Sequence, residues 1–225
     1  MMHARERMLG RLRAAAPAPS DDAALDRRIG AHYSAAPPQS AALVDAFERA
    51  LVASRADVWR ATAADWPAQL AQRIAAHGAR RLLLDPAGAE GAALLAALPP
   101  TVAPLPFRAP LEQWTDELFD TVDAGFTVAR SGIAATGTLV LAPDPGTPRT
   151  VSLVPPLHIA LVYADTLHAT LFDAVQAERW GDGMPSNLVL VSGPSKTSDI
   201  QQTLAYGAHG PRWMWVVIVT ERGTP

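Results

Sequence analysis

Three short segments of this chain gather residue types that bind or transform small polar molecules. In the first, residues 132–138, two threonine hydroxyls surround a glycine in the run Thr136-Gly137-Thr138. Glycine lets the backbone approach a ligand closely, and each hydroxyl can donate or accept a hydrogen bond. The same run also fits a tight connection between two strands, so this segment alone leaves both interpretations open.

The second segment, residues 191–200, places several hydroxyls beside Lys196, the single lysine of the chain. We expect it to follow a strand and to open a helix, so that free backbone N–H groups and the positive helix end face the loop. A carboxylate or phosphate is the ligand that this combination favours. The spacing of a phosphate-binding Walker A loop is absent. A capping box accounts for Ser198 and Gln201, but not for Ser195, Lys196 or Thr197.

The third segment, residues 207–212, holds His209 between two glycines and directly ahead of an apolar run. Histidine exchanges a proton near neutral pH, and a carboxylate can do the same once its pKa is shifted. His209 and Asp199 are therefore the candidates for moving a proton. A hydrogen-bonded structural histidine is the alternative interpretation of His209.

Composition excludes several classes of function. The chain has no cysteine, which rules out a thiolate nucleophile, cysteine-ligated zinc and an iron–sulfur cluster held by this chain. No histidine spacing suggests a metal site, so we expect the chain to bind no metal or cofactor. The formal charge of -3 argues against nucleic acid as a partner.

The hydropathy pattern indicates neither membrane insertion nor a secretory signal. The longest strictly apolar run is residues 213–219, far shorter than the roughly 20 residues that a membrane helix needs. The arginine-rich start is not followed by an apolar stretch of signal-peptide length. We therefore expect a cytoplasmic protein. The sequence leaves open whether it forms a homo-oligomer.

The order of predicted elements indicates an α/β fold. Residues 1–40 read as a helical N-terminal arm ending at two prolines, and residues 41–225 as one α/β domain with an open, mostly parallel sheet flanked by helices. Strands are expected near 58–61, 81–84, 101–104, 126–129, 138–141, 158–162, 188–191 and 213–219. Helices are expected at 40–52, 65–78, 88–98, 111–119, 165–175 and from the lysine loop to about 207.

The three segments are expected to meet. Each combines small, hydroxylic and turn-forming residues, and we place them at the carboxyl ends of predicted strands, where ligands bind in open α/β sheets. Residues 131–137 are expected to form a tight connection between the strands on either side of them.

Four runs follow one another along the second half of the chain: Ile133-Ala134-Ala135-Thr136-Gly137-Thr138, Ser152-Leu153-Val154-Pro155, Gly193-Pro194-Ser195-Lys196-Thr197-Ser198-Asp199-Ile200-Gln201 and Gly207-Ala208-His209-Gly210-Pro211. Taken in this order, they resemble the LutC/YkgG family, the lactate utilization protein C proteins, and its LUD domain. The resemblance covers residues 120–219 specifically. Ala135 and Gln201 stand where that family commonly has glutamate, which puts a general-base role at position 135 in doubt.

The resemblance implies a fold similar to the NagB/RpiA/CoA-transferase-like proteins. It also implies a role in oxidising L-lactate to pyruvate beside iron–sulfur partner proteins, on which the clusters would reside. With the loops, it suggests one pocket for a small carboxylate or phosphate-bearing ligand. The residues expected to bind that ligand are Thr136, Gly137, Thr138, Gly193, Pro194, Ser195, Lys196, Thr197, His209 and Gly210.

Two other functions remain open on the sequence. One is a stand-alone enzyme of the sugar-phosphate isomerase or CoA-transferase type, although the catalytic carboxylate of such enzymes is not evident. The other is a structural scaffold with a vestigial pocket. Stabilisation by a sugar phosphate would favour the first, and an unchanged phenotype of Lys196 and His209 variants would favour the second.

Overall fold

The computed structural model describes residues 4–15, 22–33, 40–107, 110–198 and 204–221. The chain divides into two units, Met1–Pro37 and Pro38–Pro225. The first unit contains two helices, α1 (Ala4–Ala14) and α2 (Asp22–Tyr33). Neither helix buries a residue, as expected for helices without an apolar partner inside their own unit.

The second unit is built on a six-stranded sheet with the order β1-β12-β7-β4-β2-β3. Every neighbouring pair in this sheet is parallel, which confirms the predicted open, mostly parallel arrangement. The strands are β1 (Asp57–Ala61), β2 (Arg81–Leu83), β3 (Ala103–Leu105), β4 (Ala124–Val128), β7 (Leu157–Tyr163) and β12 (Trp213–Val219).

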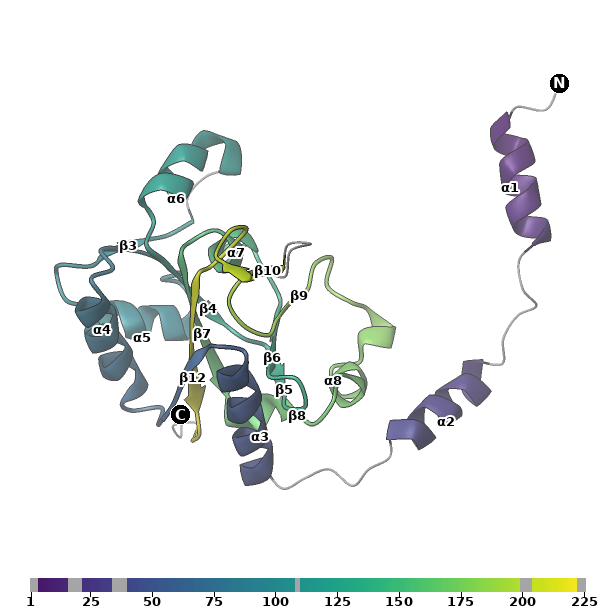
Figure 1. The fold of residues 1–225 in the computed structure, drawn as a ribbon, viewed down its shortest axis with the longest axis horizontal. Coiled ribbons are helices and arrows are strands. Elements are labelled where there is room, and N and C mark those ends of the chain that lie inside the picture. Colours follow the sequence, from purple (N-terminus) through teal and green to yellow (C-terminus); the bar gives the residue numbers. More distant parts are fainter. Residues whose placement is uncertain (1–3, 16–21, 34–39, 108–109, 199–203, 222–225) are drawn as a thin grey trace. The chain divides into compact units, whose positions relative to one another are not determined.

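The alternating side chains of these strands pack into hydrophobic clusters on both faces of the sheet, the two largest of which lie on opposite faces. One core packs the sheet against α4 (Trp66–His77) and α5 (Ala89–Ala97). The other packs it against α3 (Ser40–Ala53) and a second, smaller sheet, as Figure 1 shows. Because β7 and β12 are covered on both faces, nearly all of their residues are apolar and buried.

The smaller sheet has the order β8-β5-β6-β9, and its strands are β5 (Ser131–Ile133), β6 (Thr138–Leu141), β8 (Leu167–His168) and β9 (Val189–Val191). The predicted tight connection over 131–137 is thus partly a strand, since β5 folds back to pair with β6. The helix predicted to begin at Asp165 is α8 (Leu171–Ala177). It begins later because the side chains of Thr170 and Asp173 form a capping box there.

The helix predicted after Gly193 is wrong for the part of that segment that the structure describes. β10 (Lys196–Ser198) and β11 (Leu204–Tyr206) form an antiparallel pair there. Backbone bonds fix this arrangement: Ser195 N donates to Pro211 O at 2.8 Å, and Gly207 N donates to Ser195 O at 2.9 Å. Residues 196–198 therefore form a strand and not the expected helix start with its anion-binding N–H groups. Gln201, the partner of Ser198 in the expected capping box, lies outside the described residues.

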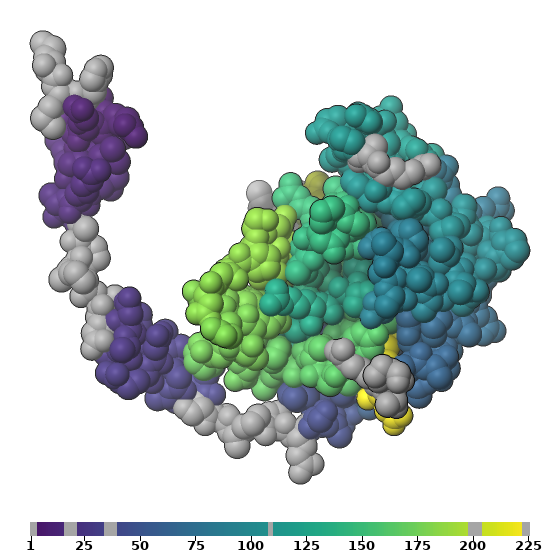
Figure 2. All heavy atoms as spheres, turned by 180° about the vertical axis from the view of Figure 1, so that it is seen from behind, coloured from purple at the N-terminus to yellow at the C-terminus, as the bar shows by residue number. Residues whose placement is uncertain are grey.

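The remaining elements complete the second unit. A one-turn helix, η1 (Leu111–Gln113), leads into α6 (Thr115–Thr121), which stands out from the body in both Figure 1 and Figure 2. A short helix, α7 (Thr150–Leu153), precedes β7, and two further single turns, η2 (Ala164–Thr166) and η3 (Trp180–Asp182), flank α8. Within the described ranges, no helix is long and apolar enough to cross a bilayer.

Candidate functional site

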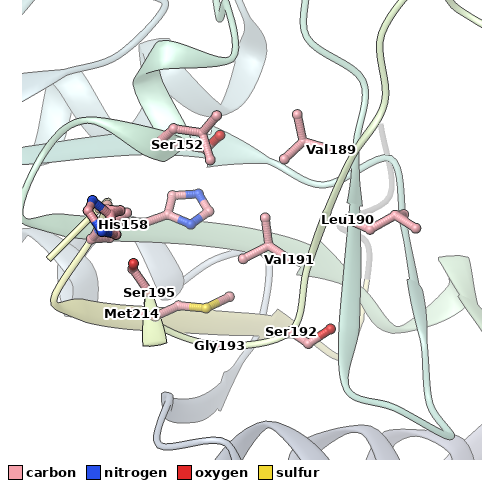
Figure 3. A pocket seen from close by; sticks show the side chains of 13 residues that line it. Ser152, His158, Val189, Leu190, Val191, Ser192, Gly193, Ser195 and Met214 are labelled. Atoms are coloured by element: carbon pink, nitrogen blue, oxygen red, sulfur yellow. The ribbon is translucent and has the colours of Figure 1, made fainter. Parts of the chain in front are cut away.

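A cavity of about 250 Å³ lies between the six-stranded sheet and β9 of the smaller sheet (Figure 3). His158 and Met214, the second residues of β7 and β12, are register partners and form its floor. The cavity thus opens at the amino ends of these two strands, not at the carboxyl ends where we expected a ligand. Its lining is Ser152, Leu153, His158, Val189, Leu190, Val191, Ser192, Gly193, Ser195, His209, Gly210, Pro211 and Met214.

His158 is the most unusual residue of the cavity. It is 1% exposed, and the next four residues of its strand are all apolar. Its Nε2 lies 2.9 Å from Oγ1 of Thr127, whereas its Nδ1 is buried without a hydrogen-bond partner among the described residues. Burial lowers the pKa of the imidazole to about 4, because a low-dielectric surrounding disfavours its charged form. The ring is therefore neutral near pH 7, and its unpaired Nδ1 is buried within a residue that lines the cavity.

Gly125 of β4 lets α7 pack close enough to the sheet to contribute to the lining of the cavity. Gly125 is the register partner of His158, and a Cβ on it would lie 2.0 Å from the carbonyl oxygen of Val151. Only glycine therefore lets α7 sit against β4 at this level. Through that contact α7 delivers Ser152, which is 3% exposed and whose hydroxyl donates to the carbonyl of Arg149 at 3.0 Å.

Two of the three segments singled out in the sequence meet at the cavity. Ser195, His209 and Gly210 all line it, and backbone bonds between the two loops hold them together. A Cβ on Gly210 would lie 3.2 Å from Cβ of Ser195, so this glycine allows the loops to approach closely. Ser195 is half-buried and His209 is exposed.

The first segment reaches the cavity only indirectly. The hydroxyl of Thr138 lies 2.6 Å from that of Thr136 and 2.7 Å from that of Ser192, which lines the cavity. Gly137 has a φ of +60°, and a Cβ there would lie 2.7 Å from the backbone nitrogen of Leu51. Gly137 is thus explained by its packing against the end of α3.

Lys196 and Pro194 face a neighbouring hollow of about 380 Å³. Gly193 lines both spaces, as does Ser192, and the other lining residues of the hollow are Ala53, Ser54, Arg55 and Tyr206. Thr197 lies in β10 and lines neither space. Asp199 falls outside the described residues, so its predicted part in proton transfer stays a prediction.

Sequence reasoning missed three residues of this region. An ionisable side chain inside an apolar strand was the available signal for His158. Ser152 belongs to one of the four family-like runs but was not carried into the predicted site. Arg55 gave no sequence signal, because only the fold brings the end of α3 beside the lysine loop.

The lining determines what the cavity can hold. It offers hydroxyls, the neutral imidazole of His158, the exposed imidazole of His209 and apolar walls, and among the described residues it includes no carboxylate, lysine or arginine. This composition suits a small molecule that presents an uncharged oxygen to His158. Across the described residues, no group of three or more histidine, cysteine, aspartate or glutamate side chains could hold a metal ion.

Comparison with known proteins gives one family and several relatives. The family model of the LUD domain matches residues 44–219. An uncharacterized protein of Neisseria meningitidis serogroup B is 35% identical over 223 residues, covering 97% of this chain and 94% of that protein. Lactate utilization protein C of Shouchella clausii is 34% identical over 109 residues, which cover 47% of this chain and 48% of that protein.

A solved structure shares the architecture. The crystal structure of a DUF162 family protein from Deinococcus radiodurans matches with a TM-score of 0.59 and 26% sequence identity, covering 81% of this chain and 99% of that one. A second lactate utilization protein C, from an Exiguobacterium species, is 35% identical over 107 residues and covers 46% of each chain. The chain thus spans about half the length of the two relatives named lactate utilization protein C.

Proposed function

Because this chain belongs to the LUD domain family, we propose that it is an accessory subunit of an L-lactate utilization system and that the cavity over His158 binds a small ligand needed for that role. The relatives named lactate utilization protein C support the first part. The composition of the cavity supports the second.

The proposed role places the electron transfer on partner proteins. Oxidising L-lactate to pyruvate removes two electrons and two protons in total, one hydrogen coming from the carbon that bears the hydroxyl and the other from the hydroxyl oxygen. A chain without cysteine cannot hold an iron–sulfur cluster on thiolates, so iron–sulfur partner proteins would accept the electrons. This chain would contribute ligand binding and contacts to those partners.

The unpaired Nδ1 of His158 carries the ligand proposal. A buried polar atom without a hydrogen-bond partner costs roughly 1–3 kcal/mol of folding stability. A ligand hydroxyl or carbonyl that reaches this atom would supply the partner; because the hydroxyl of Thr127 can either donate to Nε2 or accept from it, both tautomers of His158 are compatible with that contact. Because the imidazole is neutral, it would act as a hydrogen-bonding group toward an uncharged oxygen.

The alternative of a stand-alone isomerase or CoA transferase is less well supported. Enzymes of these types use a catalytic carboxylate, and no acidic residue is among the described residues that line the cavity. Ala135, at the position where the LutC family commonly has glutamate, is exposed and lies outside the lining.

Deletion of the gene in its host tests the proposed function. We expect the strain to stop growing on L-lactate as the sole carbon source while it grows normally on pyruvate, since only the oxidation step is removed. The tagged protein should also co-purify with iron–sulfur proteins. Normal growth on L-lactate after a clean deletion would contradict the proposal.

A further inference from the structure

The hollow beside the cavity brings together two cations that are far apart in the sequence. Arg55 comes from the end of α3 and Lys196 from β10, and both line this hollow of about 380 Å³ with the hydroxyl-bearing residues Ser54 and Ser192. The hollow adjoins the His158 cavity, because Ser192 and Gly193 line both spaces.

Tyr206 contacts Arg55 and lies opposite Lys196 in the β10–β11 pair. The guanidinium carbon of Arg55 lies 4.6 Å from the centroid of the Tyr206 ring, a cation–π contact. Lys196 is the register partner of Tyr206 in the β10–β11 pair. Arg55 also has a left-handed backbone with φ of 69°, and its N–H donates to the carbonyl of Val52 at 2.9 Å. The two positive groups are therefore brought to one place by the fold itself.

The charge of this hollow is uncompensated in the described part of the chain. None of its lining residues is acidic, and neither Arg55 nor Lys196 forms an ion pair with a described carboxylate. The last carbonyls of α3 accept bonds from the N–H groups of residues 54–56, which reduces the negative end of the helix dipole. The protein as a whole has a formal charge of -3, so this local positive pair runs against the overall balance.

We propose that Arg55 and Lys196 bind the phosphate of a small phosphate monoester whose uncharged, oxygen-bearing end enters the cavity at His158. This rests on the proposed function and deepens it, because it assigns a chemical class to the ligand of the same cavity. What still separates the chain from a sugar-phosphate isomerase is the lack of a carboxylate in the described lining of the cavity. The two linings differ in charge: the described residues that line the cavity include no lysine, arginine or carboxylate, whereas those that line the hollow include two cations. We therefore assign the uncharged end of the ligand to the cavity and its phosphate to the hollow. Only a ligand with one neutral and one anionic end uses both.

A phosphate satisfies the two cations better than a carboxylate does. A phosphate monoester carries close to two negative charges near pH 7 and presents three acceptor oxygens. The planar guanidinium can take two of these oxygens while the ammonium of Lys196 takes the third. A carboxylate has one charge and two oxygens, which leaves one of the cations without a full partner.

Isothermal titration of the full chain with three probes tests this assignment. The probes are inorganic phosphate, hydroxyacetone phosphate, which joins a carbonyl to a phosphate, and levulinate, which joins a carbonyl to a carboxylate. We expect hydroxyacetone phosphate to bind about tenfold more tightly than either of the other probes, because a tenfold gain in affinity is what one additional hydrogen-bonded group contributes. Arg55→Gln and Lys196→Gln should each weaken both phosphate probes about tenfold. Both positions are exposed, so these variants are expected to fold.

Two controls separate the parts of the proposal. Arg73→Gln removes another arginine that stacks on an aromatic ring, with its guanidinium carbon 4.0 Å from the centroid of Trp59, and it should leave all affinities unchanged. His158→Phe should abolish the advantage of hydroxyacetone phosphate over inorganic phosphate while phosphate itself still binds.

The assignment is overturned if Arg55→Gln and Lys196→Gln leave phosphate binding unchanged, or if levulinate binds as tightly as the phosphate ester. Growth on L-lactate is measured separately. A deletion strain that grows normally, together with intact phosphate-ester binding, would remove the lactate role and leave the ligand assignment standing.

Discussion

The pH dependence of folding stability reports directly on His158. In the folded protein burial lowers the pKa of this imidazole from 6.5 to about 4. Between these two values the unfolded chain binds a proton that the folded chain does not, so acidification favours the unfolded state. The contribution is fully present above the unfolded pKa and is lost as the pH falls toward the folded pKa. Stability attributable to His158 should fall by about 2 kcal/mol from about pH 7 to about pH 5, and by about 3 kcal/mol near pH 4.

Urea unfolding of wild type and His158→Phe across this pH range, followed by tryptophan fluorescence, measures the effect. Every other titrating group is common to the two proteins, so the difference between their unfolding free energies isolates His158. We expect that difference to shift by about 2 kcal/mol between about pH 7 and about pH 5 in favour of the variant at the acidic end. His158→Gln, which also cannot titrate in this range, provides the same comparison with a polar side chain. Parallel pH profiles for wild type and both variants would refute the argument.

Two further substitutions test the packing of α7 beside the cavity and the start of α8. Gly125→Ala should lower the free energy of unfolding by about 2 kcal/mol or more in urea unfolding, because its Cβ would lie 2.0 Å from the carbonyl oxygen of Val151. Gly181→Ala is the control and should change stability little, since there is open space around Gly181. Equal stability of the two variants would contradict the packing of α7. Thr170→Ala should cost about 1 kcal/mol by the same measurement, because it removes the capping box with Asp173, and an unchanged midpoint would contradict that role.

The sequence predicts the main sheet well because its signals there are local. The buried runs at 81–84, 158–162 and 213–219 are strands, and the helix that ends at Gly78 does so with a left-handed φ of +86°, as the glycine signal indicates. These segments are covered on both faces, so composition and length suffice to identify them. The alternation of helix and strand then leads to a parallel sheet.

The lysine loop was predicted less well because tertiary bonds decide its structure. Its serines and threonine fit a helix start as readily as a strand, and the bonds that Ser195 makes to Gly207 and Pro211 are invisible in the sequence. For the same reason Lys196 was assigned to the pocket of His209, whereas the structure places it with Arg55 in the adjoining hollow.

The smaller sheet explains why the site lies at an unexpected edge. Because β9 pairs with β6, it lies over the amino ends of β7 and β12, and a cavity forms there between the smaller sheet and the six-stranded sheet. Neither that pairing nor the contact of Gly125 with α7 has a local signature. The residues of the site were partly identifiable by type, but their arrangement required the fold.

Complementation of the deletion strain tests most directly whether the cavity serves lactate utilization. The strain would receive wild type, His158→Phe or His77→Phe, the last being exposed and outside the cavity while keeping an aromatic ring beside Trp213 and Trp215. With equal protein levels, we predict growth on L-lactate for wild type and His77→Phe and none for His158→Phe, with all three growing on pyruvate. Full growth of the His158→Phe strain on L-lactate would contradict the account.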